Sequence, residues 1–249
     1  MSANECNSIE QLMRLWQKKA PVKTHYLSNK QRVDIEIDHN NNFFIPDGIV
    51  DEKTWEEVKS GKRILLVLKE AYEDDHSKEQ WSINKALRDA GPWGAIWNRV
   101  CEWTRGIHDT TRDKIAGYIP SDKMRSNGTT SANEWLRRIA VMNLKKSGGQ
   151  SKSDYGEISA YANADAQEII REIELIDPDI VVCGATFGDI NRITGNTMQI
   201  DYDRRFCFSN VIGNKERLFI DFYHPANHFS ALLNYYGIVG IYQQALNSK

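Results

Sequence analysis

Four short apolar segments, separated by stretches with helical or loop patterns, constrain the fold of this chain more than any other feature. They are residues 63–68 (RILLVL), 139–142 (IAVM), 179–183 (DIVVC) and 218–222 (LFIDF). Each has the length and apolar content of a buried strand. Buried strands that alternate with helices form mostly parallel sheets. We therefore expect one α/β domain over residues 1–249, with a three-layer α/β/α fold around a central, mostly parallel four-stranded sheet.

The residues between these segments predict the helices and loops. Apolar residues at helical spacing predict helices at residues 8–19, 79–89, 94–105, 157–176 and 228–246. Residues 205–209 are expected to form an edge strand. Residues 106–132 lack periodicity and predict a long loop. Residues 1 to about 60 are expected to form a helical extension before the first strand.

Charge is distributed unevenly along the chain. The formal net charge is −2, but residues 104–153 contain ten Lys or Arg against four Asp or Glu, a local balance of +6. Such a segment indicates either a basic face that binds phosphate or a solvated loop with chance clustering.

The sequence also bears on compartment and cofactors. No stretch is long and apolar enough to span a bilayer, and the start is polar without an apolar signal core, so we expect a cytoplasmic protein with no membrane partner. None of the four cysteines, Cys6, Cys101, Cys183 and Cys207, forms a CxxC pair. We therefore expect no zinc or iron–sulfur site and no disulfide. No organic cofactor or obligate protein partner is indicated.

Polar residues follow each predicted strand. Ligands of open parallel sheets bind beyond the carboxyl ends of the strands. In this chain those ends lead into residues 69–72, 143–146, 184–186 and 223–227, which we call the carboxyl rim. The rim is therefore expected to hold the functional site.

The residue types at the rim fit the cleavage of a glycosidic bond. A carboxylate such as Glu70 can orient water and stabilise an oxocarbenium ion on a sugar. An imidazole such as His224 can donate to negative charge on the departing ring. The Asn143 amide offers a donor and an acceptor to a base edge, and Lys145 and Lys146 beside it are expected to bind phosphate.

The motifs around these residues resemble those of the uracil-DNA glycosylase superfamily. VLKEAY resembles the first motif, in which a strand ends at the catalytic carboxylate, so the resemblance assigns that role to Glu70. MNLKK resembles the middle motif, whose Asn recognises the base, which corresponds to Asn143. YHPAN resembles the closing His-Pro-Ser motif, which makes His224 the residue that stabilises the leaving base. PDIVVCGATFGDI resembles the strand and turn between them, and the order agrees from about residue 60 onward.

The resemblance implies further contacts. It places Tyr72 and the ring of Trp81 against the extruded base, although Trp81 could equally be a core residue. It places Asn227, His228 and Phe229 at the DNA, where an apolar wedge would replace the flipped base. Lys69 at the rim is a further expected phosphate ligand. The list of expected site residues is thus Lys69, Glu70, Tyr72, Trp81, Asn143, Lys145, Lys146, His224, Asn227, His228 and Phe229.

The sequence departs from the superfamily pattern at several small residues. Leu68 replaces the usual Gly, Ala71 the Pro, and Ala226 the Ser. With the long loop at 106–132, these changes predict a divergent member whose preferred base is modified or damaged, and members that attack hypermodified phage DNA make antiviral defence one expected setting. The expected reaction is base flipping followed by hydrolysis to an abasic site.

Other readings of the same residues stay open. A conventional uracil-DNA glycosylase is favoured by Tyr72. A catalytically silent DNA-binding module would need neither Glu70 nor His224. A hydrolase of free nucleosides would not need the basic segment, since a monomer makes few phosphate contacts.

Overall fold

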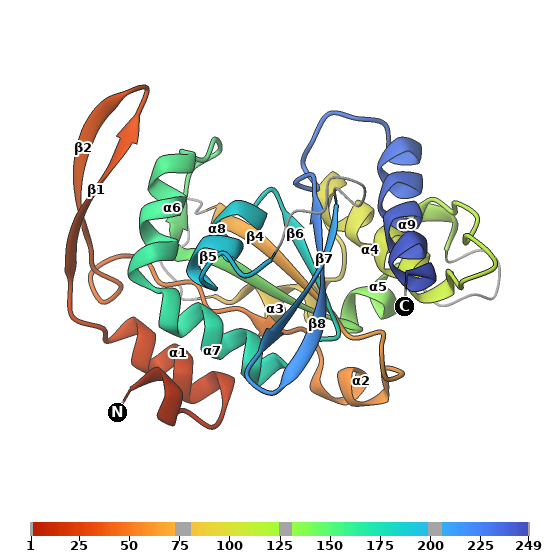
Figure 1. The fold of residues 1–249 in the computed structure, drawn as a ribbon, viewed down its shortest axis with the longest axis horizontal. Coiled ribbons are helices and arrows are strands. Elements are labelled where there is room, and N and C mark those ends of the chain that lie inside the picture. The colour runs from red at the N-terminus through yellow and green to blue at the C-terminus, as the bar shows by residue number, and fades with distance from the viewer. Residues whose placement is uncertain (1, 73–80, 125–130, 199–205, 249) are drawn as a thin grey trace.

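A mixed α/β fold built on one mostly parallel sheet appears in the computed structural model, which describes residues 2–72, 81–124, 131–198 and 206–248 (Figure 1). The described part of the sheet has six strands in the order β3-β5-β4-β6-β8-β7. These strands are β3 (Gly48–Ile49), β4 (Ile64–Tyr72), β5 (Ile139–Gly149), β6 (Ile180–Gly184), β7 (Cys207–Ile212) and β8 (Lys215–Phe222).

The four central strands are the four apolar segments of the sequence. β5, β4, β6 and β8 run parallel to one another, so their carboxyl ends meet at one edge of the sheet. The expected count of four strands was too small, because β3 and β7 extend the sheet by antiparallel pairing at its two sides. β7 corresponds to the predicted edge strand at 205–209, of which residue 205 lies outside the described part.

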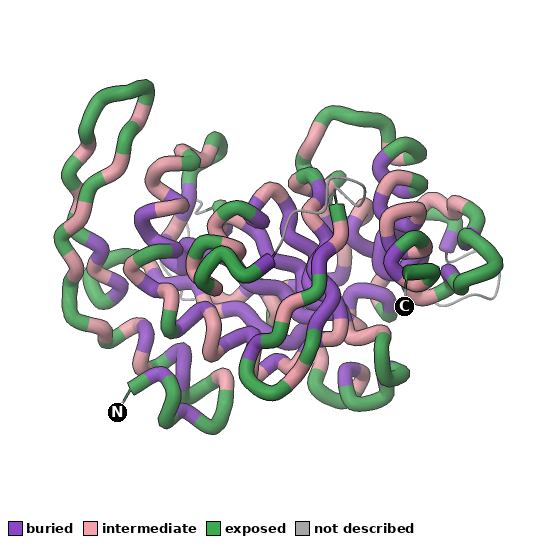
Figure 2. The backbone as a smooth tube through the Cα atoms, in the orientation of Figure 1, coloured by how far each residue is buried: buried purple, intermediate pink, exposed green. Residues whose placement is uncertain are grey.

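Helices pack against both faces of this sheet. Alternate residues of β4 divide between two apolar clusters: Ile64, Leu66 and Leu68 pack with α3, α4, α5 and α9, whereas Leu65 and Val67 pack with α1, α6, α7 and α8. Burial is concentrated in the strands and on the helix faces that cover them (Figure 2). The helices are α1 (Ile9–Gln17), α2 (Glu52–Glu57), α3 (Ile83–Ala90), α4 (Gly94–Asp109), α5 (Ala132–Arg137), α6 (Tyr155–Ala164), α7 (Ala166–Ile176), α8 (Phe187–Ile193) and α9 (Ala231–Asn247).

The sequence predicts a helical N-terminal extension, but the extension also contains strands. Between α1 and α2 it forms an antiparallel hairpin of β1 (Val22–Ser28) and β2 (Gln31–Ile37), which projects beside α6 (Figure 1). Both central residues of its turn, Asn29 and Lys30, have positive φ, as a tight hairpin turn requires. Without a glycine there, the turn carried no sequence signal.

Three other boundaries differ from the prediction. The expected helix 157–176 is two helices, α6 and α7, which meet at the buried Asp165. α4 continues to Asp109 and α5 begins at Ala132, so the predicted loop is shorter at both ends. β5 continues through the glycine-rich stretch to Gly149. In the described part of the chain, no helix combines the length and apolar character needed to cross a membrane.

Candidate active site

Strand register places the predicted site residues along the carboxyl rim. Leu68 of β4 lies opposite Asn143 of β5, and Glu70 lies opposite Lys145. His224 follows β8, and β6 lies between β4 and β8. Two strand spacings separate β4 from β8, about 10 Å. Glu70 and His224 therefore occupy the same edge of the sheet, with one strand between them.

Glu70 is tightly held rather than open to solvent. Its Oε2 accepts a hydrogen bond from Lys145 Nζ at 3.0 Å, and the same ammonium lies 3.0 Å from Glu157 Oε1 of α6. Only 4% of the Glu70 side chain and 5% of the Lys145 side chain are exposed. Burial opposes the Lys145 charge, but Glu157 and Glu70 outweigh it and raise the pKa of Lys145.

Gly149 packs directly against the Glu70 side chain. Between the pairs Glu70–Lys145 and Tyr72–Gly149 the ladder is irregular, so β5 bulges as it passes the end of β4. A Cβ at Gly149 would lie 2.5 Å from Glu70 Cγ and 2.7 Å from the Ala71 carbonyl oxygen. Only glycine allows the backbone to approach Glu70 this closely.

His224 is neutral and its tautomer is fixed. The backbone N–H of Ala226 donates to Nδ1 of the imidazole at 3.1 Å, which leaves the proton on Nε2. Burial, followed by the positive charge of Lys69, lowers the pKa of His224 to about 4. At neutral pH the ring thus presents an Nε2–H donor without a charge. Lys69 itself lies over the ring of Tyr155, 4.7 Å from its centroid.

Asn143 is a buried rim residue whose side-chain amide is unused. It is 2% exposed, and neither its side-chain oxygen nor its side-chain nitrogen has a hydrogen-bond partner among the described residues. A buried polar atom without a partner costs about 1–3 kcal/mol. The amide could recover this cost by binding a ligand with a donor and an acceptor.

Lys146 does not fit the predicted phosphate role. Its side chain is 0% exposed and its ammonium pairs with Asp47 and Glu172, both also 0% exposed. The alternation of β5 turns Lys146 away from the rim toward α7 and Trp16. The expectation that Lys146 binds phosphate is therefore wrong, and Lys145 is committed to two carboxylates rather than free for DNA.

The loop after His224 is held by a closed set of hydrogen bonds. The amides of Asn227 and Asn234 bond to each other in both directions, and Asn227 also donates to the His224 carbonyl and accepts from the Phe229 N–H. Arg99 of α4 donates to the carbonyls of Pro225, Asn227 and Phe229. These bonds use both donors and both acceptor positions of the Asn227 amide. The predicted contact between Asn227 and DNA therefore has no free side-chain group to make it.

Aromatic side chains of this loop remain accessible. Tyr223 and Phe229 are 51% and 52% exposed, and their ring centroids are 5.0 Å apart in an edge-to-face arrangement. With Phe222, Leu233, Asn234 and Gly237 they line an open, largely apolar pocket. His228 is exposed beside them.

Tyr72 and Trp81 are not brought to Asn143. Tyr72 is 61% exposed and lies opposite Gly149, four residues beyond the level of Asn143, or roughly 13 Å along the strand. Trp81 is half-buried and packs on the core cluster that contains α3 and α4. The structure therefore favours the core interpretation of Trp81.

Arg105 of the basic segment has a structural role. Arg105 is buried and donates to the Gly117 carbonyl and the Tyr235 hydroxyl, while its ion pair is with Asp109. Residues 110–124 pack on α4 and α9, through contacts such as Tyr118 to Glu102 and Gln243 to the Thr111 carbonyl. These contacts do not test the prediction that this loop borders the pocket, and residues 125–130 lie outside the described part.

Several residues of the site carried no signal in the sequence. Glu157 reads as an ordinary acidic residue in the first turn of α6, whose N-cap is Asp154. From the sequence, Gly149 is predicted to lie in a loop, and Arg99 is predicted to lie on the surface of a helix. Each acts through a partner distant in sequence, which no local pattern encodes. The sequence matches no protein-family model and no curated protein.

Proposed function

We propose that the chain is a DNA glycosylase that binds an extruded, modified or damaged base and hydrolyses its N-glycosidic bond. The observation that carries the proposal is the Asn143 amide, which is buried at the carboxyl rim with both polar atoms unpartnered among the described residues. A nucleobase edge offers a donor and an acceptor side by side, and Asn pairs with such an edge in a bidentate manner.

The two other rim groups fit the chemistry of the bond. Water adds to C1′ of the sugar, the bond from C1′ to the base nitrogen breaks, and its electron pair leaves with the base. Glu70, held beside Lys145, would stabilise the positive charge on the sugar and accept a proton from the water. The Nε2–H of neutral His224 would donate to the negative charge on the departing base. The products are an abasic site and the free base.

The loop of residues 223–230 favours a polymer over a free nucleoside. Its exposed Tyr223 and Phe229 rings offer stacking surface for bases beside the reacting nucleotide. No Asp or Glu occurs from residue 222 to the end of the chain, so this surface does not repel phosphate.

The test is cleavage of oligonucleotides, single-stranded and duplex, that carry uracil, other deaminated bases or phage-type modified cytosines. Abasic products are revealed by strand cleavage in alkali. One class of base should be released, and Glu70→Gln should lower the rate about 10²–10⁴-fold while DNA binding persists. Glu157→Gln is the matched control, because Glu157 shares Lys145 with Glu70 but is not proposed to contact the sugar.

The alternatives give distinct results. Binding of the oligonucleotides without release of any base would identify a silent DNA-binding module. Hydrolysis of nucleosides alone would identify a nucleoside hydrolase. Release of uracil in preference to every modified base would identify a conventional uracil-DNA glycosylase.

A further inference from the structure

The edge of the sheet next to Asn143 is interrupted. Phe44 bridges Ser147 of β5, and Gly48 pairs with Val141. From Phe44 to Gly48 the N-terminal extension advances four residues, whereas β5 advances six from Val141 to Ser147. A break of this kind leaves backbone groups without ladder partners and often lies beside a functional residue. Asn143 pairs with Leu68 of β4 on one side, but on the side facing the N-terminal extension it lies within the stretch of β5 that has no strand partner.

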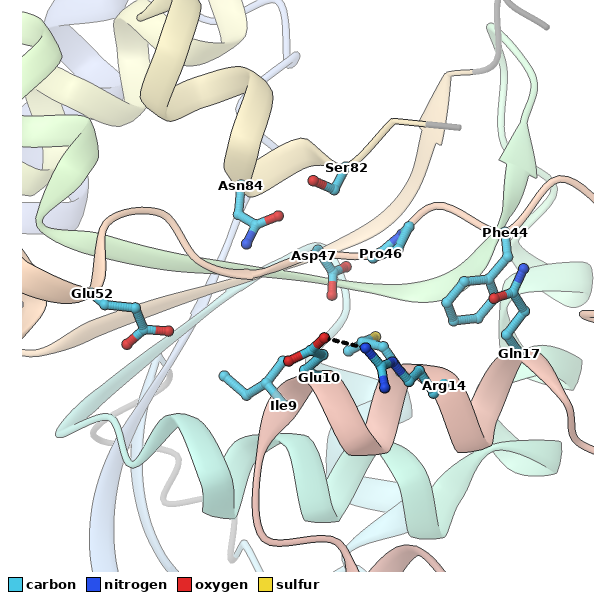
Figure 3. Close-up of a pocket in the computed structure, with 11 residues that line it drawn as sticks. Ile9, Glu10, Arg14, Gln17, Phe44, Pro46, Asp47, Glu52, Ser82 and Asn84 are labelled. Carbon is cyan, nitrogen blue, oxygen red and sulfur yellow. Dashed lines mark hydrogen bonds and ion pairs between the residues drawn. The ribbon is translucent and has the colours of Figure 1, made fainter. Parts of the chain in front are cut away.

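Asp47 fills the interruption with its side chain. Its Oδ2 accepts a hydrogen bond from the backbone N–H of Asn143 at 2.6 Å, in place of a strand carbonyl. Gly48 follows with φ +134°, a conformation that lets the chain rejoin the ladder. In Figure 3 Asp47 lies between Asn84 of α3 and Glu10 and Arg14 of α1, on the wall of an open pocket. The Asp47 residue is 2% exposed.

Buried charges keep the other oxygen of Asp47 occupied. Oδ1 pairs with Lys146 Nζ, which also donates to Glu172 Oε2 at 2.7 Å. Burial opposes the Lys146 charge, but Asp47 and Glu172 outweigh it and raise the pKa of Lys146. Burial and the Asp47 charge raise the pKa of Glu172 well above its ordinary value, which favours its protonated form.

We infer that Asp47 is a positioning residue for Asn143: its carboxylate fixes the β5 backbone at the base-reading amide. The inference rests on the proposed role of Asn143. It gives the N-terminal extension a part in the site, although none of its residues stands at the carboxyl rim. It also explains the Lys146 pair, because a buried carboxylate in this position needs a buried cation.

Asp47→Asn tests the inference because Lys146 Nζ and the Asn143 backbone N–H would then compete for the one remaining side-chain oxygen at position 47. A hydrogen bond from an ammonium is stronger than one from a neutral amide N–H. The introduced side-chain oxygen should therefore turn to Lys146, and its NH₂ group should face the Asn143 N–H, where two donors meet. Amide hydrogen exchange, measured by NMR without any substrate, should accelerate at Asn143 at least tenfold relative to Val141. Glu172→Gln, which alters the same cluster without contacting Asn143, should leave this ratio unchanged.

A pair of double variants keeps the test valid if the single variant does not fold. Asp47→Asn with Lys146→Met removes both charges and frees the introduced oxygen for the Asn143 N–H, so protection should return. Asp47→Ala with Lys146→Met also removes both charges but offers no acceptor, so Asn143 should exchange fast. Equal exchange at Asn143 in the two double variants would overturn the inference.

Activity provides the second readout. If Asn143 selects the base, Asp47→Asn should reduce discrimination between the preferred base and the next best by about tenfold, the size of one lost hydrogen bond. Glu172→Gln should retain discrimination. Fast exchange at Asn143 with no base release by any form of the protein would leave Asp47 as the positioning residue and would refute the glycosylase proposal alone.

Discussion

His224→Gln should remove a loss of stability that the native chain suffers in acid. Burial and the nearby Lys69 charge lower the pKa of His224 from 6.5 to about 4 in the folded chain. Between these values the unfolded chain binds a proton that the folded chain does not, so stability falls as the pH drops from 6.5 toward 4. Above pH 6.5 the His224 imidazole is neutral in both the folded and the unfolded chain, so it does not contribute to the pH dependence of stability.

The magnitude follows from the size of the shift. At pH 5 the solution is about 1.5 pH units below the pKa of His224 in the unfolded chain. Each of these units lowers the free energy of unfolding by about 1.4 kcal/mol. The free energy of unfolding should therefore fall by about 2 kcal/mol more in the native chain than in His224→Gln when the pH is lowered from 7.5 to 5.

Urea unfolding at the two pH values measures this difference. His108, whose pKa burial also lowers to about 4, is present in both proteins and cancels from the comparison. His25→Gln, at an exposed position of the hairpin, reports the effect of removing a surface imidazole. An equal loss of stability in the native chain and in His224→Gln would show that the folded chain accepts a proton at His224 and that the neutral-donor role is mistaken.

Three further substitutions probe the contacts around the site. Lys146→Ala should lower the free energy of unfolding by about 3–5 kcal/mol in chemical denaturation, because Asp47 loses its buried cation; a loss below 1 kcal/mol would contradict the pairing. Lys69→Met should raise the pKa of His224 in an NMR titration, since a repelling charge is removed; a fall in that pKa would exclude the proposed proximity. Arg99→Met should speed proteolytic cleavage within residues 225–229, whose carbonyls lose their donor, without changing cleavage elsewhere.

The sequence predicted the central sheet because its strands are buried on both faces. Ile64–Tyr72 and Ile180–Gly184 begin as continuous apolar runs, a pattern that does not depend on any partner. The β1–β2 hairpin was missed because its turn lacks the glycine that marks a tight hairpin, although the residues of its strands alternate between half-buried and exposed. β3 has only two residues, too few for any periodicity.

The site shows where prediction from sequence stops. Ligands of parallel sheets bind beyond the carboxyl ends of the strands, and this rule predicted the carboxyl rim as the place of the site. Glu70, Asn143 and His224 lie at this one edge of the sheet. Adjacent lysines of the same motif nevertheless have different partners. Lys145 pairs with Glu70 and Glu157, whereas Lys146 faces the opposite side and pairs with Asp47 and Glu172. A strand alternates its faces at every residue, so the motif alone fixes neither partner.

The buried charges and the unpaired amide belong to one arrangement. Replacing a buried ion pair by apolar residues of similar volume is often neutral or stabilising, so the Asp47–Lys146 pair is weak evidence for stability. An unpartnered buried amide lowers stability outright. Both lie on the same short stretch of β5, joined through the Asn143 N–H. Two unfavourable features at one place are expected at a binding site, where a ligand completes what the fold leaves open. In the proposed function the ligand would complete the Asn143 side chain, and the Asp47 carboxylate, from the extension outside the rim, accepts a hydrogen bond from the Asn143 backbone N–H.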